Sequence, residues 1–315
     1  MARSILIVGF SVTAEPGGFV EVSDKAGWPE EVCVRRVGIG GVQPFHLMYV
    51  LPAILRDYEP DMVVLEIATP GFRDVPDPQE KHQEALNSLL YTCRRFNVPV
   101  GMLDLPRRDI DPETDWVFLM HQRVCSELGL PHRQVLIQNE TLIHDAVHPT
   151  KEGKQLYADV FSALVDDMLA SPIVPEIAAP KVQHDTISLL PETAQKNDNR
   201  QFSRAGYEAG FWEIPEGEES IWPLQEGMCV VGLSFLRGPK SGLLRITGDQ
   251  TVELQAYDRF CYYERFGLSL FKPLSGDVLS IRQLPGVPEI DLLKGEKDYD
   301  ARIGYVGHLL IEMSQ

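Results

Sequence analysis

The chain has 315 residues, and its 46 acidic and 29 basic side chains give a formal charge of -17. A field of this sign repels nucleic-acid phosphates and anionic lipid surfaces, so neither is an expected partner. The five cysteines are scattered and show no CxxC spacing, which predicts reduced thiols and a cytoplasmic protein. The apolar run at the N-terminus is too short for a signal peptide or a membrane span.

Five apolar, β-branched runs in the first half of the chain predict strands. They cover residues 4–10, 32–38, 61–69, 98–105 and 134–138. Their starts lie 28 to 37 residues apart, about the length of a strand plus a crossover helix. Helix-like segments separate or follow them, at 44–58, 76–96, 111–129 and 150–170. This alternation predicts a parallel five-stranded sheet with helices on both faces.

The composition changes at Ser171. Residues 171–200 hold four prolines and many polar side chains without a sustained period, which predicts a linker. Beyond it, short β-rich segments punctuated by Gly, Pro and Asp predict an antiparallel β-sandwich. The expected domains are therefore 1–170, an α/β domain, and 201–315, a sandwich, joined by 171–200.

Three polar residues near the predicted strand and helix ends suggest nucleophilic catalysis. Ser11 follows the first strand, while Asp145 and His148 precede the last helix. In a doubly wound sheet such loops open onto one edge, so Ser11 and His148 are expected to meet. A serine needs an imidazole as base, and the imidazole needs a carboxylate to orient it. The α/β-hydrolase fold is disfavoured because Thr13 stands where its nucleophile elbow requires a second glycine.

Three stretches around these residues resemble the blocks of the SGNH, or GDSL-like, hydrolase superfamily. IVGFSVT (7–13) is similar to its first block, VGIGGVQ (37–43) to its second, and DAVHPTKEG (145–153) to its last, the DxxH block. The resemblance covers residues 4 to 168. It implies a flavodoxin-like three-layer α/β/α sandwich and ester hydrolysis through an acyl-serine, with no metal and no cofactor.

The resemblance also implies roles for individual residues. Ser11 would be the nucleophile, His148 the general base and Asp145 the residue that orients it. The oxyanion would be held by the backbone N–H groups of Ser11 and of the block-two glycine, Gly41 or alternatively Gly40.

The third block departs from the family pattern. Where the family has GxND, this chain reads EIATPG, with Pro70 at the position of an asparagine that donates to the oxyanion. Proline has no hydrogen to donate. Loss of one such donor typically costs about 2.7 to 4 kcal/mol of transition-state stabilisation. Either another group substitutes, with Thr69 the nearest hydroxyl, or turnover is slow, or the fold has been kept for binding.

The leading hypothesis is a serine esterase that removes a small acyl group, acetyl above all, from a carbohydrate or related ester. Two alternatives stay open: acyl transfer to a sugar hydroxyl, and a non-catalytic degenerate hydrolase that serves in binding or assembly. The sandwich domain could bind carbohydrate or form a homo-oligomer interface. Its aromatic residues could line a sugar platform, but at strand spacing they are more often core residues: Trp212, Trp222, Tyr257, Tyr262 and Tyr263.

Two further motifs carry no predicted ligand. The histidines at 46, 82, 121 and 132 show no metal-ligand spacing, so no metal is expected. The GIGG stretch at 38–41 lacks the lysine of a phosphate-binding loop and the spacing of a dinucleotide fingerprint, which makes it a turn.

Overall fold

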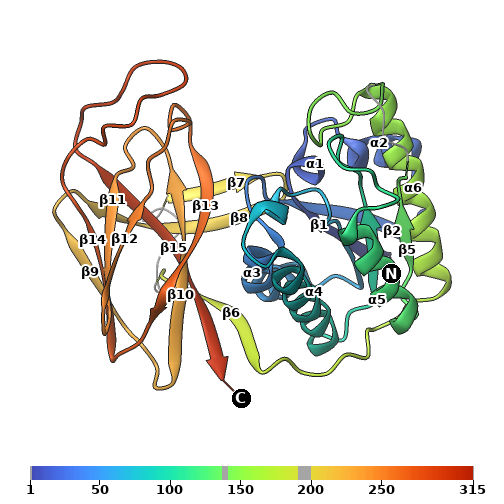
Figure 1. Cartoon of the computed structure of the whole chain (residues 1–315), viewed down its shortest axis with the longest axis horizontal. Coiled ribbons are helices and arrows are strands. Elements are labelled where there is room, and N and C mark those ends of the chain that lie inside the picture. Colours follow the sequence, from blue (N-terminus) through green and yellow to red (C-terminus); the bar gives the residue numbers. More distant parts are fainter. Residues whose placement is uncertain (1, 137–140, 191–199, 315) are drawn as a thin grey trace. The chain divides into compact units, whose positions relative to one another are not determined.

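The computed structural model describes residues 2–136, 141–190 and 200–314, which form two compact units (Figure 1). The first unit comprises Met1–Pro180 together with Arg204–Tyr207, and the second comprises Lys181–Ser203 and Glu208–Gln315. None of the helices described is long and apolar enough to cross a membrane.

The first unit is built on the predicted parallel sheet of five strands. They are β1 (Arg3–Gly9), β2 (Val32–Gly38), β3 (Met62–Leu65), β4 (Val100–Asp104) and β5 (His132–Gln134). Their spatial order is β2-β1-β3-β4-β5, and every neighbouring pair is parallel. This is the flavodoxin-like order, so the predicted fold class is confirmed. β3 is shorter than its apolar run, whereas β5 begins before the predicted run at 134–138 and shares only Gln134 with it. Residues 137 and 138 of that run lie outside the described residues.

Helices cover both faces of this sheet (Figure 1). They are α1 (Ser11–Ala14), α2 (Phe19–Ala26), α3 (Pro44–Tyr58), the 3-10 turn η1 (Phe72–Asp74), α4 (Pro78–Arg95), α5 (Trp116–Leu128) and α6 (Lys151–Ala170). On one face, Phe19 of α2 and Phe161 of α6 pack on Ile5 and Val64 of the strands. α3 and α4 pack together on the other face. Of these helices, α1 and α2 were not predicted from the sequence.

The second unit consists of two antiparallel sheets, as predicted. One contains β6 (Val182–Ser188), β7 (Arg200–Arg204), β8 (Tyr207–Pro215), β10 (Met228–Arg237), β13 (Arg265–Leu274) and β15 (Ile303–Ser314); the other contains β9 (Glu219–Pro223), β11 (Leu243–Thr247), β12 (Thr251–Gln255) and β14 (Val278–Gln283). Leu233 and Leu309 of the first sheet share a buried core with Ile246 and Ile281 of the second. The two sheets therefore pack face to face around one hydrophobic core.

The predicted linker over 171–200 contains a strand. β6 pairs with β15 along its whole length, from His308 opposite Ser188 to Ser314 opposite Val182. The second unit therefore begins at Lys181, because these main-chain hydrogen bonds make 182–188 part of its sheet. Residues 191–199 of the predicted linker lie outside the described part of the chain.

The aromatic residues of the second unit divide between core and loop. Trp212 and Trp222 pack against the sandwich core, and Tyr257 is 1% exposed. Tyr262 and Tyr263 lie side by side on the loop between β12 and β13, with ring centroids 5.1 Å apart. The five residues thus do not form one common platform.

Candidate active site

Ser11 lies in the first turn after β1, an interior strand of the parallel sheet. β1 ends two residues earlier, and Ser11 opens the four-residue helix α1. α1 packs tightly on the end of β2, since a Cβ added to Gly38 would come within 2.4 Å of the Cα of Ala14. This packing brings the Gly40–Gly41 loop beside the serine, because a Cβ on Gly40 would lie 3.9 Å from that of Ser11.

Gly41 has a conformation that favours glycine. Its φ of 81° lies in the left-handed region, where side chains other than glycine are strained. The predicted backbone donors, at Ser11 and Gly41, thus belong to two turns that the packing of α1 on β2 holds together.

Asp145 and His148 form the hydrogen-bonded pair that the sequence predicts. One carboxylate oxygen of Asp145 accepts the backbone N–H groups of Val147 and His148, at 2.9 and 2.8 Å. The other lies 2.9 Å from Nδ1 of the His148 ring. An ionised carboxylate can only accept here, so Nδ1 carries the hydrogen and Nε2 presents a lone pair. The imidazole therefore presents Nε2 as a hydrogen-bond acceptor, the arrangement that a general base requires.

The environment of Asp145 keeps it ionised. Partial burial by itself raises the pKa of this carboxyl, but the N–H groups of His148 and Val147, together with the His148 ring, outweigh that effect and lower the pKa to about 2. Asp145 is thus an anion throughout the neutral range.

The loop that carries this pair is clamped at its base. Thr150 N donates to Leu142 O at 2.7 Å, and His144 N donates to His148 O at 3.0 Å. Gly153 has to be glycine because a Cβ there would come within 2.1 Å of Leu142 O. The glycine that follows DxxH in the sequence is therefore explained by a close approach of backbone to backbone.

Shared packing and an ion pair tie the Ser11 turn to the His148 loop. Val12, next to Ser11, is buried in a hydrophobic cluster against which Val147, next to His148, also packs. Glu15, just after α1, forms an ion pair of 2.7 Å with Lys154 in the first turn of α6. The fold thus brings the two segments to one edge of the sheet. Within the described residues, no hydrogen bond joins the His148 ring to Ser11, and such bonds often tighten only when substrate is bound.

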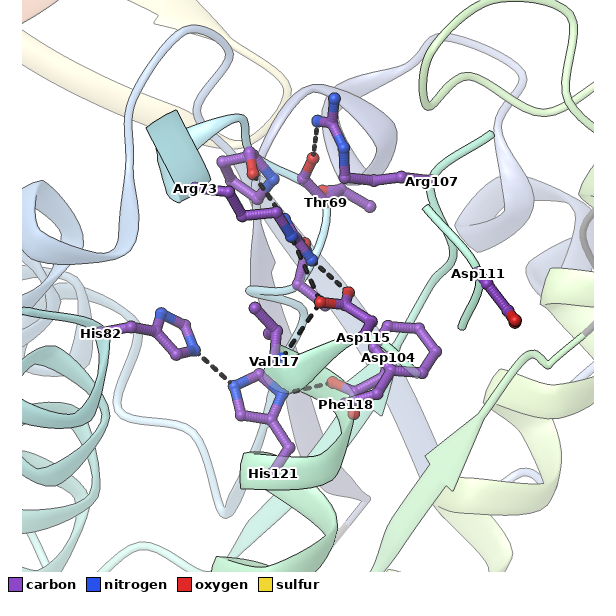
Figure 2. Close-up of polar contacts among 12 residues, drawn as sticks. Thr69, Arg73, His82, Asp104, Arg107, Asp111, Asp115, Val117, Phe118 and His121 are labelled. Carbon is purple, nitrogen blue, oxygen red and sulfur yellow. Dashed lines mark hydrogen bonds and ion pairs between the residues drawn. The ribbon is translucent and has the colours of Figure 1, made fainter. Parts of the chain in front are cut away.

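Two arginines donate hydrogen bonds to the third-block loop, residues 66–71, where the sequence departs from the family pattern (Figure 2). Nη1 of Arg73 donates to the carbonyls of Ala68 and Pro70, at 3.0 and 2.9 Å. Nη1 of Arg107 donates to the carbonyl of Thr69 at 2.9 Å. The backbone of this loop is therefore fixed by guanidinium groups, although Pro70 itself supplies no donor.

Arg107 and the next residue connect this loop to the Asp145 loop. Arg108 donates through its backbone N–H to Ala146 O at 2.9 Å and through Nη1 to His144 O at 3.3 Å. The segment after β4 thus bridges the third-block loop and the Asp145 loop.

The hydroxyl of Thr69 points into the protein. It donates to Oε1 of Glu66 at 2.9 Å, and Thr69 is only 2% exposed. To donate to an oxyanion, this hydroxyl would have to leave Glu66. The oxyanion role of Thr69 stays a prediction.

A buried network next to this site was missed by the sequence analysis. Nε2 of His82 lies 2.7 Å from Nε2 of His121, whose Nδ1 lies 2.6 Å from Asp104 (Figure 2). His132 reaches the second oxygen of Asp104 at 2.8 Å. The spacing of these residues gave no signal: Asp104 lies in a predicted strand, but His132 precedes the predicted run at 134–138, and only the structure pairs β4 with β5.

Asp104 is the ionised group of this network. Burial raises the pKa of Asp104, but the two histidines outweigh it and hold the pKa far below its usual range. Burial lowers the pKa of His82 well below its usual value. No group of three or more His, Cys, Asp or Glu in the described ranges is arranged to hold a metal ion.

No protein-family model and no curated protein matches this chain. A solved two-domain esterase (CEX) active on acetylated mannans, co-crystallised with mannopentaose, aligns with 100% of this chain and 91% of its own, at 15% identity and a TM-score of 0.63. Another structure of a two-domain esterase (CEX) active on acetylated mannans aligns with 100% of this chain and 92% of its own, at 15% identity and a TM-score of 0.62. The psychrotrophic esterase EstA from Pseudoalteromonas sp. aligns with 54% of this chain and 100% of its own, at 20% identity and 0.44.

The likeness to the CEX structures shows that this chain shares their complete two-domain fold. The predicted order of an α/β domain followed by an antiparallel β domain is therefore confirmed.

Proposed function

We propose that this protein is a serine esterase that removes acetyl or a similarly small acyl group from a saccharide. The observation that carries the proposal is the Asp145–His148 pair, in which an ionised carboxylate orients an imidazole on the loop tied to the Ser11 turn. The saccharide is supported by the neighbour's activity on acetylated mannans and by the second domain, which both chains possess.

The arrangement performs acyl transfer in two steps. His148 Nε2 takes the hydroxyl proton of Ser11 as the oxygen attacks the ester carbonyl, and then delivers it to the leaving alcohol. The N–H groups of Ser11 and Gly41 hold the oxyanion. Water, activated by the same imidazole, then releases the acid from the acyl-serine.

A short-chain nitrophenyl ester and acetylated mannan-oligosaccharides test this proposal. Wild type should release nitrophenol and acetate, and Ser11→Ala should reduce both rates by a factor of at least about 10³. A serine-directed phosphonate should label wild type and leave Ser11→Ala unlabelled. Equal rates in the two proteins, or label on Ser11→Ala, would refute the esterase.

Pro70 favours one further candidate, a degenerate hydrolase that binds saccharide without turning it over. That protein would bind mannan-oligosaccharides with the same affinity in wild type and Ser11→Ala and would release no acetate. Acyl transfer would appear as acetate moved to an added sugar in preference to water. The cytoplasmic location and the homo-oligomer stay predictions from the sequence.

A further inference from the structure

Glu66 is a fully buried carboxyl group directly beneath the Ser11 turn. It follows the last residue of β3, and its side chain makes contacts on both sides of Ser11. Oε2 accepts the hydroxyl of Thr13 at 3.0 Å, and the backbone N–H of Phe10 also donates to the carboxylate. Oε1 accepts the hydroxyl of Thr69 at 2.9 Å. One carboxylate thus joins the nucleophile turn to the third-block loop.

The glycine of the first block makes room for this carboxylate. A Cβ added to Gly9 would lie 2.8 Å from Oε2 of Glu66 and 2.3 Å from Oγ1 of Thr13. Any larger residue would push the carboxylate away from the turn. Gly9, Thr13 and Glu66 therefore form one packed unit under Ser11.

The surroundings of Glu66 disfavour its charge. Burial and, to a smaller extent, the charge of Asp104 on the neighbouring strand raise its pKa to about 7, against the hydrogen bonds of Thr69, Thr13 and the Phe10 N–H. Tyr157 of α6 faces the same region, and its hydroxyl has no hydrogen-bond partner among the described residues. A carboxyl in such a place lowers stability when ionised, unlike a neutral group of the same shape.

The ionised form is nevertheless the one that suits the geometry. A carboxylate accepts from all three donors at once, whereas a protonated carboxyl must donate its own hydrogen to one of the two threonines. That reversal would disturb either the turn that presents Ser11 or the loop that carries Thr69.

We infer that Glu66 is a positioning residue for the nucleophile: its carboxylate locks the Ser11 turn to the third-block loop, so that the serine hydroxyl and the oxyanion donors stay aligned. This inference rests on the proposed esterase function. The inference predicts that removal of the charge lowers activity and raises stability, because the charge would be retained for alignment at the expense of stability.

Glu66→Gln tests the inference because it keeps the shape and removes the charge. We expect kcat on the nitrophenyl ester at pH 8 to fall about 10- to 100-fold with KM unchanged, since misalignment affects the chemical step. At the same pH the variant should melt higher than wild type, by about 5 °C. At pH 5, where wild type is itself protonated, the two melting temperatures should coincide.

Thr13→Val and Thr69→Val remove one donor each. Both should also lower kcat, but by less than Glu66→Gln does. Ser23→Ala is the matched control, because among the described residues this buried hydroxyl bonds to the α2 carbonyls of Phe19 and Val20 and to no part of the Ser11 turn. Its kcat should equal that of wild type.

The outcomes separate this inference from the proposed function. An active wild type whose kcat Glu66→Gln retains overturns the positioning role alone. So does a variant that loses activity and melts lower at pH 8, because activity then merely follows folding. If wild type itself shows no Ser11-dependent hydrolysis, the esterase proposal fails and the positioning role fails with it.

Discussion

Asp145 uses each of its two carboxylate oxygens for a different purpose. One oxygen holds the loop backbone through two N–H groups, and the other orients the His148 ring. A single residue therefore determines both the shape of the loop and the tautomer of the base. The sequence predicted this pair because only two residues separate its members, so that one turn can contain both.

Asp145→Asn should separate these two roles. The amide oxygen can still accept the loop N–H groups, while the amide nitrogen facing Nδ1 favours the tautomer with its hydrogen on Nε2, which cannot act as a base. We expect kcat to fall by about 10⁴ with the melting temperature nearly unchanged. Because the wild-type pKa is about 2, the deficit should persist at every pH from 4 to 9. A deficit that disappears at any pH in this range would contradict the orienting role.

At the scale of elements, the third-block loop and α5 share one buried ion pair. Arg73, which holds the loop carbonyls, pairs with Asp115, and their side chains are 9% and 3% exposed. Asp115 also caps α5 by accepting Val117 N at 3.1 Å. The position of the loop therefore depends on the start of a helix more than 40 residues later, a link that the sequence does not reveal.

Arg73→Met should be strongly destabilising because it leaves Asp115 buried and unpaired. We expect the free energy of unfolding to fall by about 3 to 5 kcal/mol, and the double variant with Asp115→Asn to lose less than the sum of the two single variants. Urea denaturation measures each value. Arg133→Met, which breaks the exposed pair with Asp167, is the control and should change stability by less than about 1 kcal/mol. Equal losses in the two arginine variants would contradict the role of the buried pair.

The start of α3 contains a second element-scale feature. Nδ1 of His46 accepts the backbone N–H of Gln43 at 3.1 Å, and burial lowers the pKa of His46 to about 4. Below its unfolded pKa of 6.5, the unfolded chain binds a proton at this residue that the folded protein does not. Stability from this residue is therefore complete above pH 6.5 and is lost as the pH falls towards 4.

His46→Gln should remove this acid sensitivity. Between pH 6.5 and 4, the free energy of unfolding of the variant should fall by up to about 3 kcal/mol less than that of wild type. A pKa difference of 2.5 units corresponds to about that free energy. Urea denaturation at half-unit pH steps measures both slopes. Parallel curves over this window would refute the assignment.

At the scale of the whole molecule, each of the two units has its own large hydrophobic core among the described residues. Phe161 belongs to the cluster of the first unit and Phe235 to that of the second. Two tryptophans fall in each unit, Trp28 and Trp116 in the first and Trp212 and Trp222 in the second. Fluorescence can therefore follow each unit separately.

Damage to one core should affect the unfolding of its own unit. In a background with Trp212 and Trp222 replaced by Phe, the remaining signal reports the first unit alone. Phe161→Ala should lower its midpoint by the equivalent of about 3 to 5 kcal/mol, whereas Phe235→Ala should leave it in place. Ring contact of Trp28 with Phe161, centroids 5.7 Å apart, makes this probe sensitive to the first core. An equal shift from both variants would show one cooperative unit.

The sequence by itself determined β1 to β4, α3 to α6 and the Asp145–His148 pair, whereas β5 shares only Gln134 with its predicted run. Period and spacing are local properties, and they survive in the chain whatever its tertiary neighbours are. Only the tertiary structure decided that β6 belongs to the sandwich, that Glu66 joins Thr13 to Thr69, and that two histidines bond to Asp104. These contacts depend on which strand ends and helix faces lie against one another, and packing of the whole chain sets that arrangement.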